Sequence, residues 1–274
     1  MHITYLGTNT LLITQGDTTL LIDPHFSRPS MLSLLGKIRP DPDRIASGLT
    51  RSGIDRLDGI LLTHTHYDHA LDATEVLRQA GGTLYGSKSA IHLVRGSGLA
   101  AQSAVQVVPR QAYQVGAFTV CFHPARHVNF PAPMGWLMPA EGCIPRPLRP
   151  PTRFWNYQCG AVYAIQVNRT LIFGSAGFEP GAYRGLAIKS VVLGIGGLDL
   201  QPQAYLQQLY SQAVLDPGAR QVFLSHWDTF FGPPKKTPKP MRLARRSIGQ
   251  IKALGARYAH QVEILELAHT ITSE

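Results

Sequence analysis

The sequence of 274 residues lacks the features that define membrane, secreted and disulfide-bonded proteins. Its longest apolar stretches, such as SVVLGIGGL, are only as long as a strand, whereas a membrane span needs about 20 residues. The cysteines are odd in number and have no C-x-x-C spacing, which favours reduced thiols over a disulfide or a zinc ribbon; they are Cys121, Cys143 and Cys159. The start, MHITYLGT, does not resemble a signal peptide. If the natural chain begins at Met1, we expect a cytoplasmic protein.

Charged residues are also scarce. They make up 16% of the chain against 44% hydrophobic residues, a balance typical of a globular and not of a disordered protein. The net charge of +9 is confined to residues 101–274, because residues 1–100 hold nine basic and nine acidic side chains. Two segments without acidic residues stand out in that part, RPLRPPTR at 146–153 and KKTPKPMRLARR at 235–246. Each is either solvated surface or a contact for an anionic substrate, a membrane surface or nucleic acid.

Strand patterns dominate the first sixty residues, and units of one strand and one helix follow. Apolar runs predict strands at HITYLG, TLLIT, TTLLID and QVFLS, and at 59–63, 105–108, 117–122, 161–167, 170–174 and 191–195. Helical spacing predicts helices in LDATEVLRQAGG and at 203–214 and 242–255. Because both halves of the chain show this order, we predict one α/β domain over residues 1–274, with two packed sheets and helices outside.

A proline-rich segment interrupts the second half of the chain. Seven of the 21 residues from 131 to 151 are proline, which excludes a regular helix or a central strand there. We therefore predict a long ordered loop at about 129–153. Long loops inside compact domains are often lids or binding loops, so this one is a candidate cover for a site.

The most unusual segment is LLTHTHYDHA, which places four polar ligand residues within six positions directly after an apolar strand. They are His64, His66, Asp68 and His69. In extended backbone the first two imidazoles leave on the same side, and the other two residues follow where the chain turns. Imidazole and carboxylate are ligands that Zn²⁺, Mn²⁺ and Fe²⁺ share. The pattern predicts a metal site; a polar loop with coincidental histidines is the alternative.

At these residues the sequence resembles the metallo-β-lactamase superfamily of hydrolases, whose signature is H-x-H-x-D-H after a strand. ITYLGTNTLLIT and LLIDPHF resemble the opening hairpin and first motif of that family, FHPARHV the third, TLIFGSAGF the fourth and LSHWDTF the fifth. The resemblance implies a four-layer αββα sandwich. DPHFSRPS, PARH and HWDTF are most similar to the branch with the phospholipase D that acts on N-acylethanolamine phospholipids. The lactonase of ascorbate 6-phosphate is a more distant relative.

The resemblance also implies a set of ligands. His64, His66 and His127 would hold one metal ion, and Asp68, His69 and His226 a second; His123 is a competing candidate beside His127. Further residues would support or surround the ions: Asp23 would hydrogen-bond a ligand histidine, and His25 and Asp228 would line the pocket or be structural. The ion would be zinc, or else manganese or iron, with one or two ions per chain.

One position departs from the family. Its fourth motif supplies an aspartate that bridges two metal ions, and this chain has Ser175 there. A neutral hydroxyl cannot hold two dications together as a carboxylate does, so the second ion should bind more weakly unless Asp228 or Glu179 compensates. A single-ion enzyme, a hydroxide-bridged pair and a catalytically inactive relative all remain open.

The function implied is hydrolysis by metal-bound hydroxide of a phosphodiester or a phosphate-bearing ester or lactone, with Asp68 and His69 as catalytic residues. Arg146, Arg149 and Arg153 would bind the phosphate of a small or lipid-like anionic substrate. One alternative is a nuclease of the same fold, since the second half of the chain is basic. Another is a non-catalytic protein that binds metal or an anion. A homo-oligomer is compatible with each.

Overall fold

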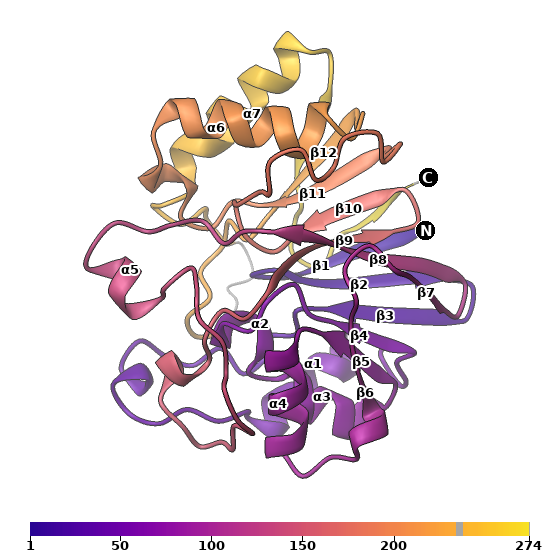
Figure 1. The fold of residues 1–274 in the computed structure, drawn as a ribbon, viewed down its shortest axis with the longest axis vertical. Coiled ribbons are helices and arrows are strands. Elements are labelled where there is room, and N and C mark those ends of the chain that lie inside the picture. Colours follow the sequence, from indigo (N-terminus) through magenta and orange to yellow (C-terminus); the bar gives the residue numbers. More distant parts are fainter. Residues whose placement is uncertain (234–237, 274) are drawn as a thin grey trace.

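The computed structural model describes residues 1–233 and 238–273 and contains two seven-stranded sheets (Figure 1). The first sheet has the order β14 (Thr270–Thr272), β1 (His2–Gly7), β2 (Thr10–Gln15), β3 (Thr18–Ile22), β4 (Gly59–Leu61), β5 (Thr83–Gly86) and β6 (Ala104–Gln106). The second has the order β13 (Gln261–Ile264), β12 (Gln221–Ser225), β11 (Ser190–Gly194), β10 (Thr170–Phe173), β9 (Val162–Val167), β8 (Phe118–Ala125) and β7 (Ala112–Val115).

Each sheet is antiparallel on one side and parallel on the other. The pairs from β3 to β6 and from β10 to β13 are parallel, and the remaining pairs are antiparallel. Strands β4, β10 and β11 are buried along their whole length, which explains their continuous apolar sequences GIL, TLIF and SVVLG. Because parallel strands end at the same edge of a sheet, the segments that follow them meet there.

The helices cover the outer faces of the two sheets. Figure 1 shows α1 (Pro42–Arg51), α3 (Ala73–Ala80) and α4 (Lys88–Gly96) against the first sheet, and α6 (Gln203–Tyr210) and α7 (Arg245–Arg257) against the second. The remaining helices are short and lie in the connections: α2 (Tyr67–Ala70), α5 (Met134–Leu137), the 3₁₀ turns η1 (Ser33–Leu35), η2 (Ala101–Ser103), η3 (Phe154–Asn156) and η4 (Leu198–Leu200), and the π-helical turn η5 (Ser211–Leu215) that follows α6. This is the expected αββα order.

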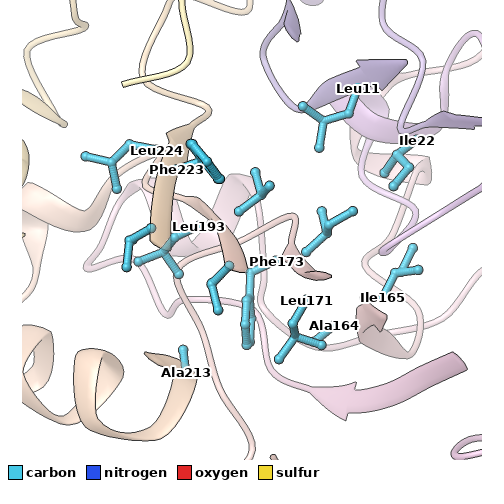
Figure 2. Close-up of a cluster of buried hydrophobic side chains, with 14 of the residues drawn as sticks. Leu11, Ile22, Ala164, Ile165, Leu171, Phe173, Leu193, Ala213, Phe223 and Leu224 are labelled. Carbon is cyan, nitrogen blue, oxygen red and sulfur yellow. The ribbon is translucent and has the colours of Figure 1, made fainter. Parts of the chain in front are cut away.

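Two apolar clusters hold the layers together. The larger lies between the sheets and under α6 and α7, and Figure 2 shows part of it, with Leu11 and Ile22 from the first sheet and Leu171, Phe173 and Leu224 from the second. The second cluster lies between the first sheet and the helices α1, α3 and α4. Burial of these side chains is the main force that fixes the relative position of the two sheets.

The predicted strands and helices are confirmed, with ends that differ by at most three residues, except that the helix predicted at 203–214 is α6 up to Tyr210 and continues as the π-helical turn η5. The short strands β5, β7, β13 and β14 and the helices α1 and α4 were not predicted. The proline-rich loop at 129–153 is mostly irregular, but it contains the four-residue helix α5. Of the basic segment at 235–246, positions 235–237 lie outside the described residues, and its last two arginines begin α7. No helix in residues 1–233 and 238–273 is long and apolar enough to cross a membrane.

Candidate metal centre

The predicted ligands gather at one edge of the sandwich, where several strands end. His64 and His66 follow β4, His127 follows β8, and His226 follows β12. Asp68 and His69 belong to the short helix α2, which begins directly after the second histidine of the signature motif. All six side chains are buried. The topology therefore brings together residues that are up to 162 positions apart, as the numbers 64 and 226 show.

The six side chains form two groups, each with ligand atoms within 4.8 Å of one another. One group is His64, His66 and His127, and the other is Asp68, His69 and His226. The ring centroids of His64 and His69, one from each group, are 3.9 Å apart, so the groups are adjacent. Two neighbouring ions could be held here, which agrees with the predicted division of ligands.

Hydrogen bonds at Nδ1 orient three of the imidazoles. The Nδ1 atom of His64 lies 3.0 Å from Thr63 Oγ1, that of His69 lies 2.8 Å from Asp23 Oδ2, and that of His127 lies 2.8 Å from the carbonyl oxygen of Val128. Each ring therefore has its Nε2 left for a ligand bond, the usual arrangement of metal-binding histidines. Nε2 of His64, Nδ1 of His66 and Oδ1 of Asp68 are buried and have no hydrogen-bond partner. Buried orphan atoms of this kind fit divalent metal ions.

Asp23 joins the first motif to the site. Its Oδ2 lies beside His69 and accepts hydrogen bonds from Asn9 Nδ2 at 2.9 Å and Thr63 Oγ1 at 2.5 Å. Its Oδ1 accepts a hydrogen bond of 2.8 Å from the Thr63 amide. Asp23 is also within 4.8 Å of ligand atoms of His64 and His69. Because its oxygens are already occupied by these donors, we assign it to orientation of His69 and not to metal coordination.

The protonation of these groups in the metal-free chain follows from burial and from the two carboxylates. Burial lowers the pKa of His66 to about 4 and holds the pKa of His64 and His127 well below the usual value. Burial alone would also lower the pKa of His69, but the carboxylates of Asp68 and Asp23 outweigh it and raise that pKa to about 10. The first group is therefore neutral and ready to coordinate, whereas His69 must release a proton first.

Ser175 lies in the wall of the pocket, and neither proposed substitute carboxylate lies in the two ligand groups. The Ser175 hydroxyl accepts a hydrogen bond of 3.1 Å from the Val128 amide. Asp228 accepts hydrogen bonds from the Tyr5 hydroxyl, the Thr8 amide and the buried Arg28 guanidinium. Glu179 pairs with Arg126 at the surface. In this structure both carboxylates are held by other partners, so neither replaces the missing bridging aspartate.

A pocket of about 420 Å³ opens above the ligands, and its walls are apolar. Four methionines, four phenylalanines and three leucines contribute to them: Met31, Met134, Met138, Met241, Phe130, Phe154, Phe230, Phe231, Leu34, Leu137 and Leu243. Asp68, His69, His127 and His226 lie in the lining with Ser175. The first part of the proline-rich loop covers this pocket through Phe130 and α5, and the Pro139 carbonyl oxygen lies 3.1 Å from His66 Nε2.

The structure does not bring the predicted phosphate-binding arginines to this pocket, whose described lining contains no arginine or lysine. Arg149 lines a different, polar groove with Arg39 and Arg95. Arg153 bonds the Leu35 carbonyl oxygen on the outside, where the bridge between Ile38 and Thr152 holds the two loops together. The prolines keep this part of the loop extended along the surface, and Arg146 is exposed there.

The two other histidines considered from the sequence lie outside the two ligand groups. His123 is on β8, with Nε2 2.8 Å from Gln166 Oε1 of the neighbouring strand. His25 lies near the pocket, with Nε2 3.1 Å from the Phe230 carbonyl oxygen, and burial lowers its pKa to about 3. Of the two candidates for the third motif, the structure therefore brings His127 and not His123 to His64 and His66.

Sequence reasoning missed several residues of the site. Tyr67 lines the pocket, and its buried hydroxyl has no hydrogen-bond partner. Ser225 donates a hydrogen bond of 2.8 Å to Asn9, which in turn bonds Asp23, so a polar chain runs from β12 to His69. Tyr67 stands inside the histidine motif and was open to the same reasoning, but Asn9 and Ser225 show no local signal.

Comparison with known proteins defines the class. The family described as the metallo-beta-lactamase superfamily matches residues 3–226. This match covers both histidine groups and most of both sheets. The chain belongs to the metallo-beta-lactamase superfamily.

Three relatives show how far the similarity extends. A UPF0173 metal-dependent hydrolase from Christiangramia forsetii is 33% identical over 84 residues, which are 31% of this chain and 31% of that protein. Igni18, a metallo hydrolase of Ignicoccus hospitalis, has 15% identity and a TM-score of 0.61, covering 100% of this chain and 98% of the other. An isothiocyanate hydrolase from Delia radicum gut bacteria has 14% identity and a TM-score of 0.58, covering 100% and 99%. The two structural likenesses show the fold alone, and the phospholipase D-like branch stays a prediction.

Proposed function

We propose that the protein is a metal-dependent hydrolase that cleaves an ester, lactone or phosphodiester bond in a substrate with an apolar body. The observation that carries this proposal is the position of two adjacent groups of three ligand atoms beside an apolar pocket. Bound divalent ions would activate water and stabilise the negative charge that develops on the substrate. Proton transfer, hydrogen bonding to the substrate and exclusion of water would depend on side chains of the protein.

Asp68 and Tyr67 are the polar groups best placed to act on water and substrate. The unpartnered Oδ1 of Asp68 can accept a proton from water, and its Oδ2 lies 3.5 Å from His69 Nε2 and 3.3 Å from His226 Nε2. The unpartnered Tyr67 hydroxyl can donate a hydrogen bond to a substrate oxygen. The methionine and phenylalanine side chains exclude water and hold the apolar body.

The residues that line the pocket also favour some classes of substrate over others. With no arginine or lysine in the described walls, a negative charge on the substrate would be met by the metal ions and their histidine ligands. This favours a carboxylic ester, a lactone or a phosphodiester with an apolar group over a substrate with a free phosphate. The pocket walls likewise offer no arginine or lysine to the phosphate of a polynucleotide, so a small apolar ester fits the pocket better than the nuclease alternative does.

The test combines metal analysis with a panel of chromogenic substrates. Zn²⁺, Mn²⁺ and Fe²⁺ are each added to metal-free protein, and p-nitrophenyl esters of increasing acyl length, a lactone and bis-p-nitrophenyl phosphate are assayed. Because each methylene that leaves water contributes about 0.8 kcal/mol, we expect kcat/KM for the esters to rise by up to about fourfold per methylene until the pocket is filled.

The double substitution His64→Ala, His66→Ala should abolish metal binding and turnover while the sheets stay folded. His123→Ala is the matched control, since this buried histidine lies outside both ligand groups. If His123→Ala loses metal and the double variant keeps it, the ligand assignment is wrong. If the parent binds metal but turns over no substrate with any of the three ions, the non-catalytic alternative replaces the hydrolase.

A further inference from the structure

The exposed large apolar side chains are concentrated around the mouth of the pocket. Eight such residues are exposed in the described chain, and six of them lie in two loops; we call these six the apolar rim: Met31, Leu32, Leu35, Trp136, Leu137 and Trp155. Leu32, Leu35 and Trp136 are 79%, 75% and 80% exposed. Single exposed apolar residues are ordinary, but a group of large ones on one face marks an interaction surface.

The rim is continuous with the apolar pocket. Met31 and Leu137 belong both to the rim and to the pocket lining, and so connect the two. Phe154, next to Trp155, also lines the pocket. In Figure 1, α5 and the indigo loop that carries η1 project on the same side of the molecule. The surface that contacts the rim would therefore also cover the entrance to the candidate metal centre.

The two loops that carry the apolar rim hold mostly positive charge. These loops, residues 29–40 and 131–156, contain five basic residues and one acidic residue. The basic residues are all exposed: Lys37, Arg39, Arg146, Arg149 and Arg153. The Arg153 guanidinium lies 5.3 Å from the ring centroid of Trp155, so a positive charge stands directly beside the apolar surface.

We propose that the apolar rim docks on an anionic lipid surface, with its leucines and tryptophans in the interfacial layer and its basic side chains among the headgroups. Tryptophan favours the membrane interface, because its ring is apolar and its N–H is polar. Each basic side chain close to an anionic bilayer adds about fivefold to the binding constant. This complementarity fits an anionic lipid surface better than a second copy of the chain, which would face the same positive charge.

Docking on a bilayer would also bring lipid acyl chains to the entrance of the apolar pocket. An acyl chain that leaves the bilayer at the rim can pass Met31 and Leu137 into the pocket without crossing water. The docking itself needs neither metal nor turnover, so it stands or falls independently of the proposed hydrolase.

The first test follows tryptophan fluorescence during titration with vesicles. The chain has three tryptophans, and Trp227 is 4% exposed, so a change of emission reports Trp136 or Trp155. With vesicles of phosphatidylcholine and phosphatidylglycerol we expect a blue shift that brominated lipids quench, and a much smaller one with phosphatidylcholine alone. Trp136→Phe should remove most of the shift but keep the vesicles bound. No shift, or an equal shift with both vesicles, overturns the proposal.

The second test measures co-sedimentation with the anionic vesicles. The triple variant Leu32→Ser, Leu35→Ser, Trp136→Ser should bind at least tenfold more weakly. The matched control Val108→Ser, Tyr258→Ser removes the two exposed apolar side chains outside the rim and should bind like the parent. Equal binding by triple variant and control contradicts the proposal. Sedimentation without lipid measures the oligomeric state. If the parent is a dimer and the triple variant is a monomer, the rim is a subunit interface and the docking proposal is wrong.

The triple variant also separates docking from catalysis. Its three residues are absent from the described pocket lining, so its metal content and its kcat/KM on a short water-soluble ester should equal those of the parent. Loss of vesicle binding with both values retained supports docking by the rim. A loss of all three properties means that the triple variant has disturbed the fold or the pocket. In that case the Lys37→Gln, Arg153→Gln variant decides, because these two basic side chains lie beside the rim segments: weaker binding to anionic vesicles with intact turnover supports the docking, and unchanged binding overturns it.

Discussion

Ser175 is the residue at which the site departs most from the pattern of its family. It lines the pocket, and its hydroxyl accepts the Val128 amide. Asp228 and Glu179 are both held by arginines and other donors. The described residues around the two ligand groups thus place a single carboxylate, Asp68, against two ions, with Asp23 behind His69. Four positive charges against this arrangement would leave the second ion weakly held.

Ser175→Asp should restore a second tightly bound ion. The change adds one negative charge and two acceptor oxygens, one of which can keep the Val128 hydrogen bond. After equal dialysis against a chelator, we expect two metal ions per chain in the variant and closer to one in the parent, measured by mass spectrometry of the metals. Ser175→Asn is the control of equal size without charge and should behave like the parent. A parent that already retains two ions contradicts the argument.

The carboxyl group of Asp72 makes the free energy of unfolding depend on pH, and this effect does not involve the metal ligands. Burial raises the pKa of this carboxyl to about 6, although Oδ2 accepts the Ser27 amide at 2.6 Å, and Oδ1 has no hydrogen-bond partner. Because the folded pKa lies above that of the unfolded chain, the stability from this group is fully present below about pH 4 and is lost as the pH rises through 6.

Asp72→Asn should remove that loss. A shift of about two pKa units corresponds to about 3 kcal/mol, so the free energy of unfolding of the parent minus that of the variant should fall by about this amount between pH 4 and pH 7.5. Urea titrations at several pH values measure it. A difference for Asp72→Asn that stays constant with pH would mean that the carboxyl is solvated or paired.

At the scale of the secondary-structure elements, the strands that precede site residues could be predicted, because a strand that is buried on both faces has a continuous apolar sequence. GIL, TLIF and QVFLS could be assigned in this way, and each ends near a site residue. The short edge strands β7 and β13 were missed because they alternate and are only partly buried. The absence of Arg146 and Arg149 from the described pocket lining could not be predicted for a different reason: composition shows a basic loop, but not which side of the molecule the loop follows.

The backbone after the strands needs glycine where the histidines pack closely. A Cβ atom on Gly196, which follows β11, would lie 2.8 Å from Nδ1 of His226. His226 itself has φ of 55° and Asp23 has φ of 44°, both in the left-handed region that non-glycine residues rarely adopt. Such strained positions persist only when the surrounding structure fixes them, as at functional sites.

Gly196→Ala should therefore displace His226 and weaken the second metal site. We expect a loss of about 1–3 kcal/mol in the free energy of unfolding from overpacking, together with a drop in metal retained per chain. Gly249→Ala is the control, because a Cβ there has nothing within 4 Å and the residue lies inside α7. It should be stabilised by roughly 0.5–1 kcal/mol with unchanged metal content. Equal metal retention in both variants would show that His226 is not held by this contact.

At the scale of the whole molecule, the six ligand side chains come from parts of the fold that lie far apart in the sequence. His64 and His66 leave the first sheet, whereas His127 and His226 leave the second, so a bound ion would link the two sheets at their common edge. The apolar cluster between the sheets continues far from that edge and includes Ile3, Leu171 and Phe223. The fold should consequently survive without metal, but with lower stability.

Removal of metal by a chelator should lower Tm by about 5–10 °C while the far-ultraviolet circular dichroism stays unchanged. An ion at about 100 times its Kd contributes about 2.7 kcal/mol, and about 2–4 °C per kcal/mol is usual for a domain near this size. Zn²⁺ should restore the Tm and Mg²⁺ should not, because imidazole ligands suit zinc and magnesium prefers oxygen. His64→Ala, His66→Ala provides the reference: its Tm should match that of the stripped parent and should not respond to chelator or zinc. A parent that unfolds on chelation would show that the metal ions, and not the apolar core, hold the two sheets together.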